Sequence, residues 1–344
     1  MKIDYIVVGL GLAGISFIEQ LKQHNKSFFV FEDNSQNASK VAGGMFNPVI
    51  LKRFTPVWQA VEQLKIAIPF YKDLEKKLNC SLIKYMDIKK GFKSIEEQNN
   101  WYIACDHPKL KNYLSKDIQN NTNTCIIAPN GLGKVKNVGY INTKLLIDKY
   151  KKKISDFLIE EKFIHSKLQI AQDKIKYKNI SAKNIVFCEG YGIKQNPFFK
   201  NLPLKEAKGE LLEIKSENLK IDFILKSSVF VMPLTTDTYK VGATFNWKDK
   251  TNLPTEPGKQ ELIDKLKKTI TCNYKITNHI AGIRPTVKDR RPLIGTHKTY
   301  KNIHLLNGLG TRGVMLAPTL SKKLFIAIEN NKEIEKEINL NRFY

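Results

Sequence analysis

The spacing of apolar and polar residues predicts a strand, a helix and a second strand at the start of the chain. Residues 3–8 (IDYIVV) are almost continuously apolar, which is typical of a short buried strand. The run 27–31 (SFFVF) repeats this pattern and ends at Glu32. Between the two runs lies a helical pattern, with Ile15, Ile18 and Leu21 on its apolar side and Glu19 and Gln20 on its polar side.

Three glycines occupy the junction between the first strand and the helix, in the pattern GxGxxG. In a dinucleotide-binding unit the first allows the tight turn, the second lets the backbone approach a pyrophosphate, and the third lets the helix pack on the strand. The helix N-terminus offers N–H donors to phosphates. Glu32 would accept hydrogen bonds from ribose hydroxyls, which disfavours NADP. We therefore predict that a dinucleotide contacts Gly9, Gly11, Leu12, Ala13, Gly14, Glu32 and Asp33, although this motif does not separate FAD from NAD.

A second pair of glycines lies in the loop 41–56 (VAGGMFNPVILKRFTP). Gly43 and Gly44 are consistent with an ordinary connection, and equally with a loop that brings backbone close to a planar cofactor. The residues alone leave both interpretations open. A helical pattern then covers residues 57–78, and Pro69 inside it predicts a kink or a break.

The middle of the chain predicts further elements that no linker separates. A buried strand at 184–188 (NIVFC) leads into a turn at Gly190, as expected where a third strand ends near the cofactor. We also expect a helix opening at 140–146, an antiparallel hairpin from 229–234 and 239–245, and an amphipathic helix at 258–270. Because the chain has no internal repeat or low-complexity segment, its domains are expected to be interleaved.

A second glycine-rich loop precedes a helix near the C-terminus. The strand 303–306 meets the loop 307–313 (NGLGTRG), and a helical pattern with Leu316, Leu320 and Leu324 follows. The N-terminus of that helix would stabilise negative charge, such as the N1/C2=O region of a reduced flavin. An NAD enzyme has no need of such a second site, so this loop favours a flavin.

The charge of the chain comes mainly from lysine. The 344 residues include 57 basic and 33 acidic side chains, a net charge of +24, which raises the question of nucleic acid binding. The lysines are dispersed over the whole chain, however, which disfavours a nucleic-acid partner and indicates a solvated surface. Only six of the basic residues are arginine, and four of these lie between 284 and 312. Since arginine is preferred for gripping carboxylates and phosphates, we expect chemistry in that segment.

Other features of the composition exclude several classes of protein. The five cysteines are scattered without a CxxC pair, and the six histidines lack the spacing of metal ligands, so neither a disulfide framework nor a metal site is predicted. No apolar run is long enough to span a bilayer. The N-terminus lacks a signal-peptide cleavage site, and we expect a cytoplasmic protein whose oligomeric state the sequence leaves open.

The motifs together resemble the D-amino-acid oxidase/glycine oxidase (DAO) family of FAD-dependent oxidoreductases. The resemblance covers essentially the whole chain and is carried by GLGLAG (9–14), AGGMFNP (42–48), VFCEG (186–190), MPL…YKVGATF (232–245), GIRPTVKDRRPLIG (282–295) and NGLGTRGVMLAP (307–318). It implies an α/β fold with a discontinuous Rossmann-like FAD-binding domain and an α+β substrate domain built on a mostly antiparallel sheet. We assign residues 1–80, 140–205 and 276–344 to the first domain, and 81–139 and 206–275 to the second.

The resemblance also implies roles for individual residues. Arg284 matches the arginine that clamps the substrate carboxylate in family members that oxidise amino acids. The alternative is a structural arginine that holds a loop through a salt bridge. The residues implied to contact FAD beyond the first motif are Gly43, Gly44, Met45, Lys167, Leu168, Gly190, Gly308, Gly310, Thr311, Arg312, Gly313 and Val314. The pair Lys167-Leu168 is expected beside the adenine.

Two positions depart from patterns found in the family. Members that bind flavin covalently have a cysteine just after the arginine-proline pair, and no cysteine follows Cys272 here, so the FAD is expected to be non-covalent. Phe230 stands where glycine oxidase-like members often have a substrate-facing tyrosine. A hydroxyl partner for the substrate is therefore lost or supplied by another residue, for which we consider Tyr239 or Tyr191.

The implied reaction is oxidation of the C–N bond of a small amine or amino acid, with hydride transfer to flavin N5 and hydrolysis of the resulting imine. The candidate catalytic residues are Arg284, Phe230 and Tyr239. Orientation of the substrate would do most of the work. Two alternatives are a FAD-dependent enzyme that modifies tRNA uridines, which the net charge would suit, and a flavin-binding protein without turnover.

Overall fold

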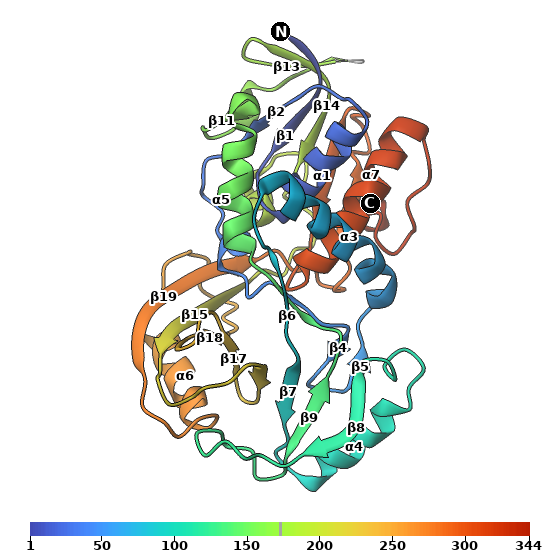
Figure 1. The fold of residues 1–344 in the computed structure, drawn as a ribbon. Helices are drawn as coiled ribbons and strands as arrows, with labels where there is room; N and C mark the ends of the chain where they lie inside the picture. Colours follow the sequence, from blue (N-terminus) through green and yellow to red (C-terminus); the bar gives the residue numbers. More distant parts are fainter. Residues whose placement is uncertain (172–173) are drawn as a thin grey trace.

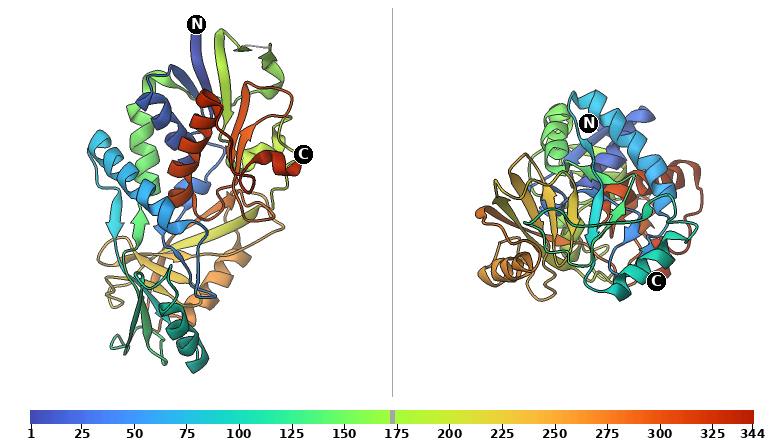
Figure 2. Two further views of the ribbon diagram at one scale, coloured as in Figure 1. Left: turned by 90° about the vertical axis from the view of Figure 1, so that its right-hand side faces the viewer. Right: turned by 60° about the horizontal axis from the view of Figure 1, so that its bottom comes forward.

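Two eight-stranded sheets organise the chain, one above the other, in the computed structural model, which describes residues 1–171 and 174–344 (Figure 1). The upper sheet contains both ends of the chain, and the lower sheet is built from segments inserted between its strands. The left view in Figure 2 shows the two layers stacked along the long axis of the molecule. The fold class expected from the sequence is confirmed.

The upper sheet has the parallel core of a Rossmann-like unit. Its order is β11-β2-β1-β14-β13-β12, with β21 beside β14 and β20 beside β21. Strands β11, β2, β1, β14 and β21 run parallel to their neighbours, while β13, β12 and β20 add antiparallel edges. The bounds are β1 (Lys2–Val8), β2 (Phe28–Phe31), β11 (Leu158–Ile159), β12 (Gln169–Ile170), β13 (Ile175–Tyr177), β14 (Ile180–Phe187), β20 (Leu293–Thr296) and β21 (Ile303–Asn307).

Side chains of the central strands alternate between two apolar cores. Val7, Val186 and Leu306 face the helices, while Ile6, Phe187 and Leu305 face the opposite core, where residues 175–204 pack. Helix α1 packs against α7, and α3 packs on the outer side of α7. The helices of this layer are α1 (Leu12–Gln23), the short α2 (Ala38–Val41), α3 (Ala60–Leu78), α5 (Thr143–Lys153) and α7 (Gly313–Asn330), with 3-10 turns η1 (Ser155–Phe157), η2 (His165–Lys167), η3 (Gly190–Gln195) and η4 (Leu340–Phe343).

The lower sheet is almost entirely antiparallel. Its order is β19-β15-β18-β17-β16-β7-β9-β8, and β16 and β7 are its parallel pair. Helix α6 covers one face through Leu262 and Leu266, and the other face looks toward the upper layer. The bounds are β7 (Ile88–Gly91), β8 (Leu114–Gln119), β9 (Leu132–Val135), β15 (Ala207–Lys215), β16 (Ile224–Lys226), β17 (Phe230–Pro233), β18 (Thr238–Gly242), β19 (Lys275–Arg284), α4 (Ile95–Cys105) and α6 (Glu256–Lys267).

Small sheets connect the two layers. Strands β3 (Met45–Phe46), β10 (Gly139–Ile141) and β6 (Ile83–Tyr85) form one of them, and β4 (Val49–Ile50) and β5 (Thr55–Pro56) form the other. The proposed division into two domains stays a prediction. Strand β19, which it assigns to the first domain, pairs with β15 in the lower sheet.

Most of the elements expected from the sequence are present, and two differ. Helix α3 continues through Pro69 without a break, because it carries a buried stripe on both sides of the proline. The predicted helix at 140–146 is instead the end of β10 followed by α5. Asn142 caps α5 by accepting a hydrogen bond from the Leu145 N–H at 3.1 Å, so the helix begins only at Thr143.

In the described part of the chain, no helix is long and apolar enough to cross a membrane. The same residues contain no cluster of three or more histidine, cysteine, aspartate or glutamate side chains that could hold a metal ion.

Candidate functional site

A cavity of about 780 Å³ lies between the two layers. Its upper wall comes from the ends of β1, β2, β14 and β21, which point toward the lower sheet, and from the first turns of α1 and α7. Its lower wall is the inner face of β19, β15, β18, β17 and β16. The carboxyl ends of parallel strands are where sheets of this kind bind ligands.

The first glycine motif forms the tight turn from β1 into α1. Gly9 has φ +100°, and a Cβ on Gly14 would collide with the Gly9 carbonyl oxygen, so the turn requires glycine at both positions. Gly9, Gly11, Leu12 and Ala13 line the cavity, whereas Gly14 is buried in the packing behind them. The first-turn N–H groups have no partners within the helix, so this end of α1 favours an anion.

Glu32 is placed beside this turn at the end of β2. One carboxylate oxygen accepts from the Leu10 N–H at 2.5 Å and the other from the Asn34 N–H at 2.7 Å. Asp33 also lines the cavity. These positions match those that the dinucleotide motif predicts for residues beside a ribose.

The region expected beside the adenine is displaced by a few residues. Lys167 is exposed to solvent at the end of η2, and Leu168 packs against the core behind the upper sheet, so neither lines the cavity. The cavity wall there is formed by Phe163 and His165. His165 Nε2 lies 2.7 Å from Glu189 Oε1, which ties this segment to the end of β14. The short 3-10 turn η2, which the sequence pattern did not reveal, turns Lys167 outward.

The second glycine pair lies on the cavity wall where the two layers meet. Gly44 has φ +66°, and a Cβ there would collide with the Ile141 carbonyl oxygen of β10. The Ile141 N–H donates to the Gly44 carbonyl oxygen at 2.9 Å. Gly43 faces the Phe230 ring of β17, with 3.4 Å between the position of a Cβ and Cζ. Of the two interpretations, this geometry favours a loop that brings backbone close to a ligand.

The C-terminal glycine loop brings a second helix N-terminus to the same cavity. Gly310, Thr311, Arg312, Gly313 and Val314 all line it. Gly308, in contrast, turns away from the cavity: its φ is +74°, and a Cβ there would lie 2.7 Å from Val287 Cγ2.

Asn307, not predicted as a site residue, joins this loop to the end of β14. Its amide donates to the Gly190 carbonyl oxygen at 2.9 Å, and its side-chain oxygen accepts from the Gly308 N–H at 2.7 Å. Gly190 itself lines the cavity with φ +55°, and a Cβ there would meet no atom within 4 Å. The asparagine thus holds the ends of two neighbouring strands at a fixed spacing.

The lower wall of the cavity is unusually open because three glycines lie on it. Gly209, Gly242 and Gly282 come from adjacent strands and share the inner face with Leu211 and Phe230. The Arg284 guanidinium lies directly over Gly209, where any Cβ would overlap it. Small residues in the sheet therefore leave room for one large cationic side chain.

Arg284 is held by groups that leave its charge unbalanced. Its NH1 donates to the Thr244 carbonyl oxygen at 3.2 Å, and the guanidinium carbon lies 4.3 Å from the centre of the Phe245 ring. No acid lies within ion-pair distance of it among the described residues. Burial lowers the pKa of Arg284 to about 10. This arrangement disagrees with a structural salt bridge and leaves the cation available for an anion in the cavity.

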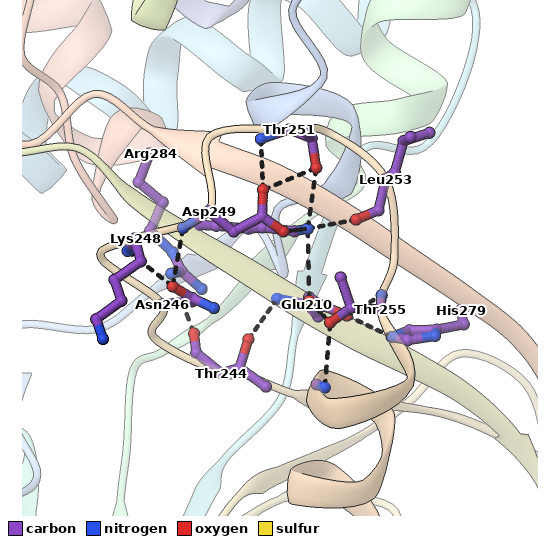
Figure 3. A network of polar contacts seen from close by, with 12 residues as sticks. Glu210, Thr244, Asn246, Lys248, Asp249, Thr251, Leu253, Thr255, His279 and Arg284 are labelled. Carbon is purple, nitrogen blue, oxygen red and sulfur yellow. Dashed lines mark hydrogen bonds and ion pairs between the residues drawn. The ribbon is translucent and has the colours of Figure 1, made fainter.

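A network of buried polar groups supports the segment that holds Arg284 (Figure 3). Glu210, on β15, is 1% exposed and accepts from the Thr255 N–H at 2.9 Å and the Thr255 hydroxyl at 2.7 Å. Lys208, two residues away and fully buried, donates to Asp249 and to the Leu253 carbonyl oxygen. These contacts fix both ends of the loop 246–255.

The same network continues to the arginine itself. The Glu210 N–H donates to the Thr244 hydroxyl at 2.9 Å, and the Thr244 N–H donates to the Glu210 carbonyl oxygen at 3.2 Å. Thr244 therefore links the buried Glu210 to the carbonyl that orients Arg284 (Figure 3). Both bonds to Thr244 are made by the backbone of Glu210, while its carboxylate holds Thr255 at the far end of the loop 246–255, so the side chain bears on Arg284 only through the position of this loop.

Replacing Glu210 by glutamine should loosen this support. The substitution Glu210→Gln keeps the shape but removes the negative charge 3.6 Å from Lys208 Nζ. We expect the free energy of unfolding to fall by about 1–3 kcal/mol, because Lys208 loses part of its compensation. We also expect a several-fold rise in the Kd for carboxylate ligands. Denaturant unfolding and ligand titration measure the two effects, and Glu256→Gln, an exposed acid at the start of α6, is the control. An unchanged Kd would show that the Glu210 side chain has no influence on ligand binding by Arg284.

Of the other candidate catalytic residues, Phe230 is in the cavity and Tyr239 is not. Phe230 lines it between Gly43 and Gly242. Tyr239 lies on the opposite face of the sheet, packed against the core under α6, and its hydroxyl donates to the Thr236 carbonyl oxygen at 3.2 Å. The assignment of Tyr239 is wrong because the strand parity of β18 turns it away. Tyr191, the other hydroxyl considered, does line the cavity.

The residues of this cavity fit FAD. Two helix N-termini, α1 and α7, end at a single space, so one can favour a pyrophosphate and the other the pyrimidine end of a flavin. Gly9 and Gly44, both with positive φ, allow the backbone to turn sharply on the walls between these points. The volume is also within the usual range for sites that bury a large ligand.

Comparison with known proteins relates part of the chain to a family model. A family model described as "FAD dependent oxidoreductase" (DAO) matches residues 159–325. Glycine oxidase of Bacillus subtilis is 28% identical over 166 residues, which is 46% of this chain and 44% of that protein. The tRNA 5-methylaminomethyl-2-thiouridine biosynthesis bifunctional protein MnmC of Marinobacter nauticus is 24% identical over 164 residues, 43% of this chain and 26% of that protein. The chain thus aligns with less than half the length of each of these relatives.

Solved structures extend the likeness to the whole fold. Glycine oxidase from Geobacillus kaustophilus has a TM-score of 0.81 at 16% identity, covering 97% of this chain and 96% of that one. The L-proline dehydrogenase from P. horikoshii has a TM-score of 0.79 at 15% identity and covers 99% and 98%. Residues 159–325, which include the arginine segment and the second glycine loop, therefore match the DAO family of FAD-dependent oxidoreductases, and the solved structures share the fold of the whole chain.

Proposed function

We propose that this chain oxidises the C–N bond of an amino acid, with Arg284 as the clamp for the substrate carboxylate and FAD bound non-covalently. The observation that carries the proposal is the guanidinium over Gly209, on the inner face of the lower sheet, which has no acid partner in the described part of the chain. Planar, forked and permanently charged, arginine suits a carboxylate that must be held in one orientation. Relatives named glycine oxidase support the same substrate class.

The residues of the chain would serve mainly to position the substrate. When FAD is bound, it would supply the chemistry by accepting a hydride from the carbon of the C–N bond. Arg284 would fix the carboxylate at the lower wall, and Phe230 would cover the substrate and exclude water. Arg312, half-buried at the start of α7 without an acid partner among the described residues, would stabilise negative charge at that end of the cavity. No side chain is assigned as general base, since an amine that binds neutral needs none.

The test is to purify the flavoprotein and follow bleaching of its flavin absorbance without oxygen. We expect glycine, sarcosine, proline or a D-amino acid to reduce the flavin, and analogues without the carboxylate to fail at the same concentration. Denaturation with acid should release the flavin into solution, as non-covalent binding requires. Failure of every amine to bleach the flavin would reject the proposal and favour a flavin-binding protein without turnover.

A second candidate is a FAD-dependent enzyme that modifies tRNA uridines. It is favoured by the similarity to MnmC and by the net charge of +24. Phosphate contacts make binding to nucleic acid steeply dependent on salt. Retention of tRNA that weakens strongly between low and high salt supports this candidate, whereas indifference to tRNA rejects it. The cytoplasmic location expected from the sequence stays a prediction.

A further inference from the structure

Lys226 carries a second charge in the cavity that no described residue balances. It ends β16 and lines the cavity wall. Among the residues that the structure describes, none accepts a hydrogen bond from its ammonium group or forms an ion pair with it. Burial lowers the pKa of Lys226 to about 8, and Lys90, Lys265 and Lys93 add repulsion. A cation placed in this way costs free energy unless an anion joins it.

The neighbouring acids are already engaged by other lysines. Lys90 Nζ lies 2.7 Å from Glu97 and also donates to the Gly91 carbonyl oxygen. Lys265 Nζ lies 2.5 Å from Glu261. Glu97 further accepts from the Lys93 N–H at 2.8 Å. Each acid of this cluster therefore serves a lysine other than Lys226. Lys265 also lines the cavity but is paired with Glu261, whereas Lys226 lines it without an acid partner among the described residues.

The sheet places Lys226 and Arg284 on the same wall. Strand pairing aligns Lys226 with Phe230, Phe230 with Gly242, and Gly242 with Leu211, and all four residues line the cavity. The Arg284 guanidinium lies over Gly209 on β15, three strands from β16. Three strand spacings correspond to ~14 Å, and both side chains are long enough to shorten that gap.

The acids of the cavity wall are confined to its other half. Those that line it are Glu32, Asp33, Glu161 and Glu189, all in the upper layer. The lower-sheet residues that line it include Arg284 and Lys226 but no acid in the described part of the chain. The electrostatic field over the substrate half is therefore positive at two separate points.

We infer that the substrate carries two anionic groups, an α-carboxylate bound by Arg284 and a second carboxylate or a phosphate bound by Lys226. The oxidisable amine would lie between them, above Phe230. This inference rests on the proposed function, because it takes the lower wall as the substrate side of the cavity. It assigns the chain to amino acids with an acidic side chain or an acidic N-substituent, and it makes glycine a poor substrate.

Binding of non-oxidisable ligands to the FAD-loaded protein tests the inference without turnover. Perturbation of the flavin absorbance gives the Kd of butyrate, of glutarate and of 3-phosphonopropionate, for the wild type, Lys226→Met and Lys226→Arg. In the wild type we expect at least one dianion to bind more tightly than butyrate. In Lys226→Met that dianion should lose roughly 10- to 100-fold in affinity, while butyrate changes less than about 2-fold. The Lys226→Arg variant should keep part of the preference for the dianion over butyrate.

Two further comparisons sharpen the result. The substitution Lys176→Met, at an exposed position of β13 that does not line the cavity, removes the same charge and should leave the preference for the dianion over butyrate intact. In the wild type the preference should decline as pH rises through about 8, because Lys226 then loses its proton. The tighter of glutarate and 3-phosphonopropionate identifies the second group as carboxylate or phosphate.

Equal weakening of butyrate and dianions by Lys226→Met, or no preference in the wild type, would overturn the inference. These outcomes are separate from failure of the proposed function. If no amine bleaches the flavin but the preference depends on Lys226, the second anion site stands and oxidation is rejected. If monocarboxylic amino acids bleach the flavin and Lys226→Met changes nothing, oxidation stands and the second site is rejected.

Discussion

Arg284→Ala should lower kcat/KM for an amino-acid substrate roughly 10²- to 10³-fold, because truncating one partner of a buried charge pair costs about 2–5 kcal/mol. The guanidinium is the group over Gly209 that faces the cavity, and its protein partners, Thr244 and Phe245, are uncharged. A carboxylate that binds at the lower wall would therefore lose the forked donor of that wall. Steady-state kinetics and titration with a carboxylate inhibitor measure the loss.

The effect of a substitution on the Tm distinguishes a carboxylate clamp from a structural salt bridge. A buried cation without an acid partner costs free energy, so Arg284→Met, which fills similar space, should raise the Tm while it abolishes carboxylate binding. A structural salt bridge would give the opposite sign, with a fall in Tm. Arg284→Lys keeps the charge but not the fork and should recover only part of the affinity.

A nearby arginine provides the control. Arg290 is exposed in the same segment, and Arg290→Ala should change neither the Tm nor the affinity for carboxylates by more than experimental scatter. If Arg284→Ala leaves the affinity for a carboxylate unchanged, the clamp assignment is wrong.

The parts of the site that could be predicted from the sequence are those in which the backbone conformation requires particular residues. GxGxxG requires glycines at fixed positions whatever surrounds it, so Gly9 and Gly14 take their expected places, and so does Glu32 at the end of β2. The loop of α7 was predictable for the same reason, since a glycine-rich segment between a strand and a helix leaves few conformations.

The residues that were missed depend on side-chain direction and on contacts between distant segments. Tyr239 was assigned to the cavity, but a strand turns alternate residues to opposite faces, and pairing with β15 and β17 decides which face is inside. Lys226 closes an otherwise apolar run, ILK, and that break in the pattern was the available signal. The network of Glu210, Lys208 and Asp249 joins residues about forty positions apart, which no local pattern records.

Gly44→Ala should deprive the protein of most of its FAD. Gly44 needs a positive φ of +66°, which costs an alanine about 1 kcal/mol, and the added Cβ would also collide with the Ile141 carbonyl oxygen. Because that carbonyl belongs to the backbone of β10, relief requires the loop 41–47 or the strand to move. Movement of the loop displaces Gly43 and Met45 from the cavity wall. We expect flavin content after purification to fall at least tenfold, measured as the ratio of absorbance at the flavin and protein bands.

The control for this variant has to separate loss of the site from general destabilisation. Gly131 has φ +75° at the start of β9, on the lower sheet away from the cavity, where a Cβ would meet the flexible Ile118 side chain at 2.8 Å. Gly131→Ala should lower the Tm by a few degrees yet keep its flavin. If Gly44→Ala loses stability to the same extent and retains its flavin, then the glycine pair only connects two strands, and the wall that it forms makes no contribution to holding the cofactor. Loss of flavin from Gly44→Ala alone would instead locate the cofactor at the junction of the two layers, on the cavity wall that carries Arg284 and Lys226, for which residues 1–171 and 174–344 provide no acid partner.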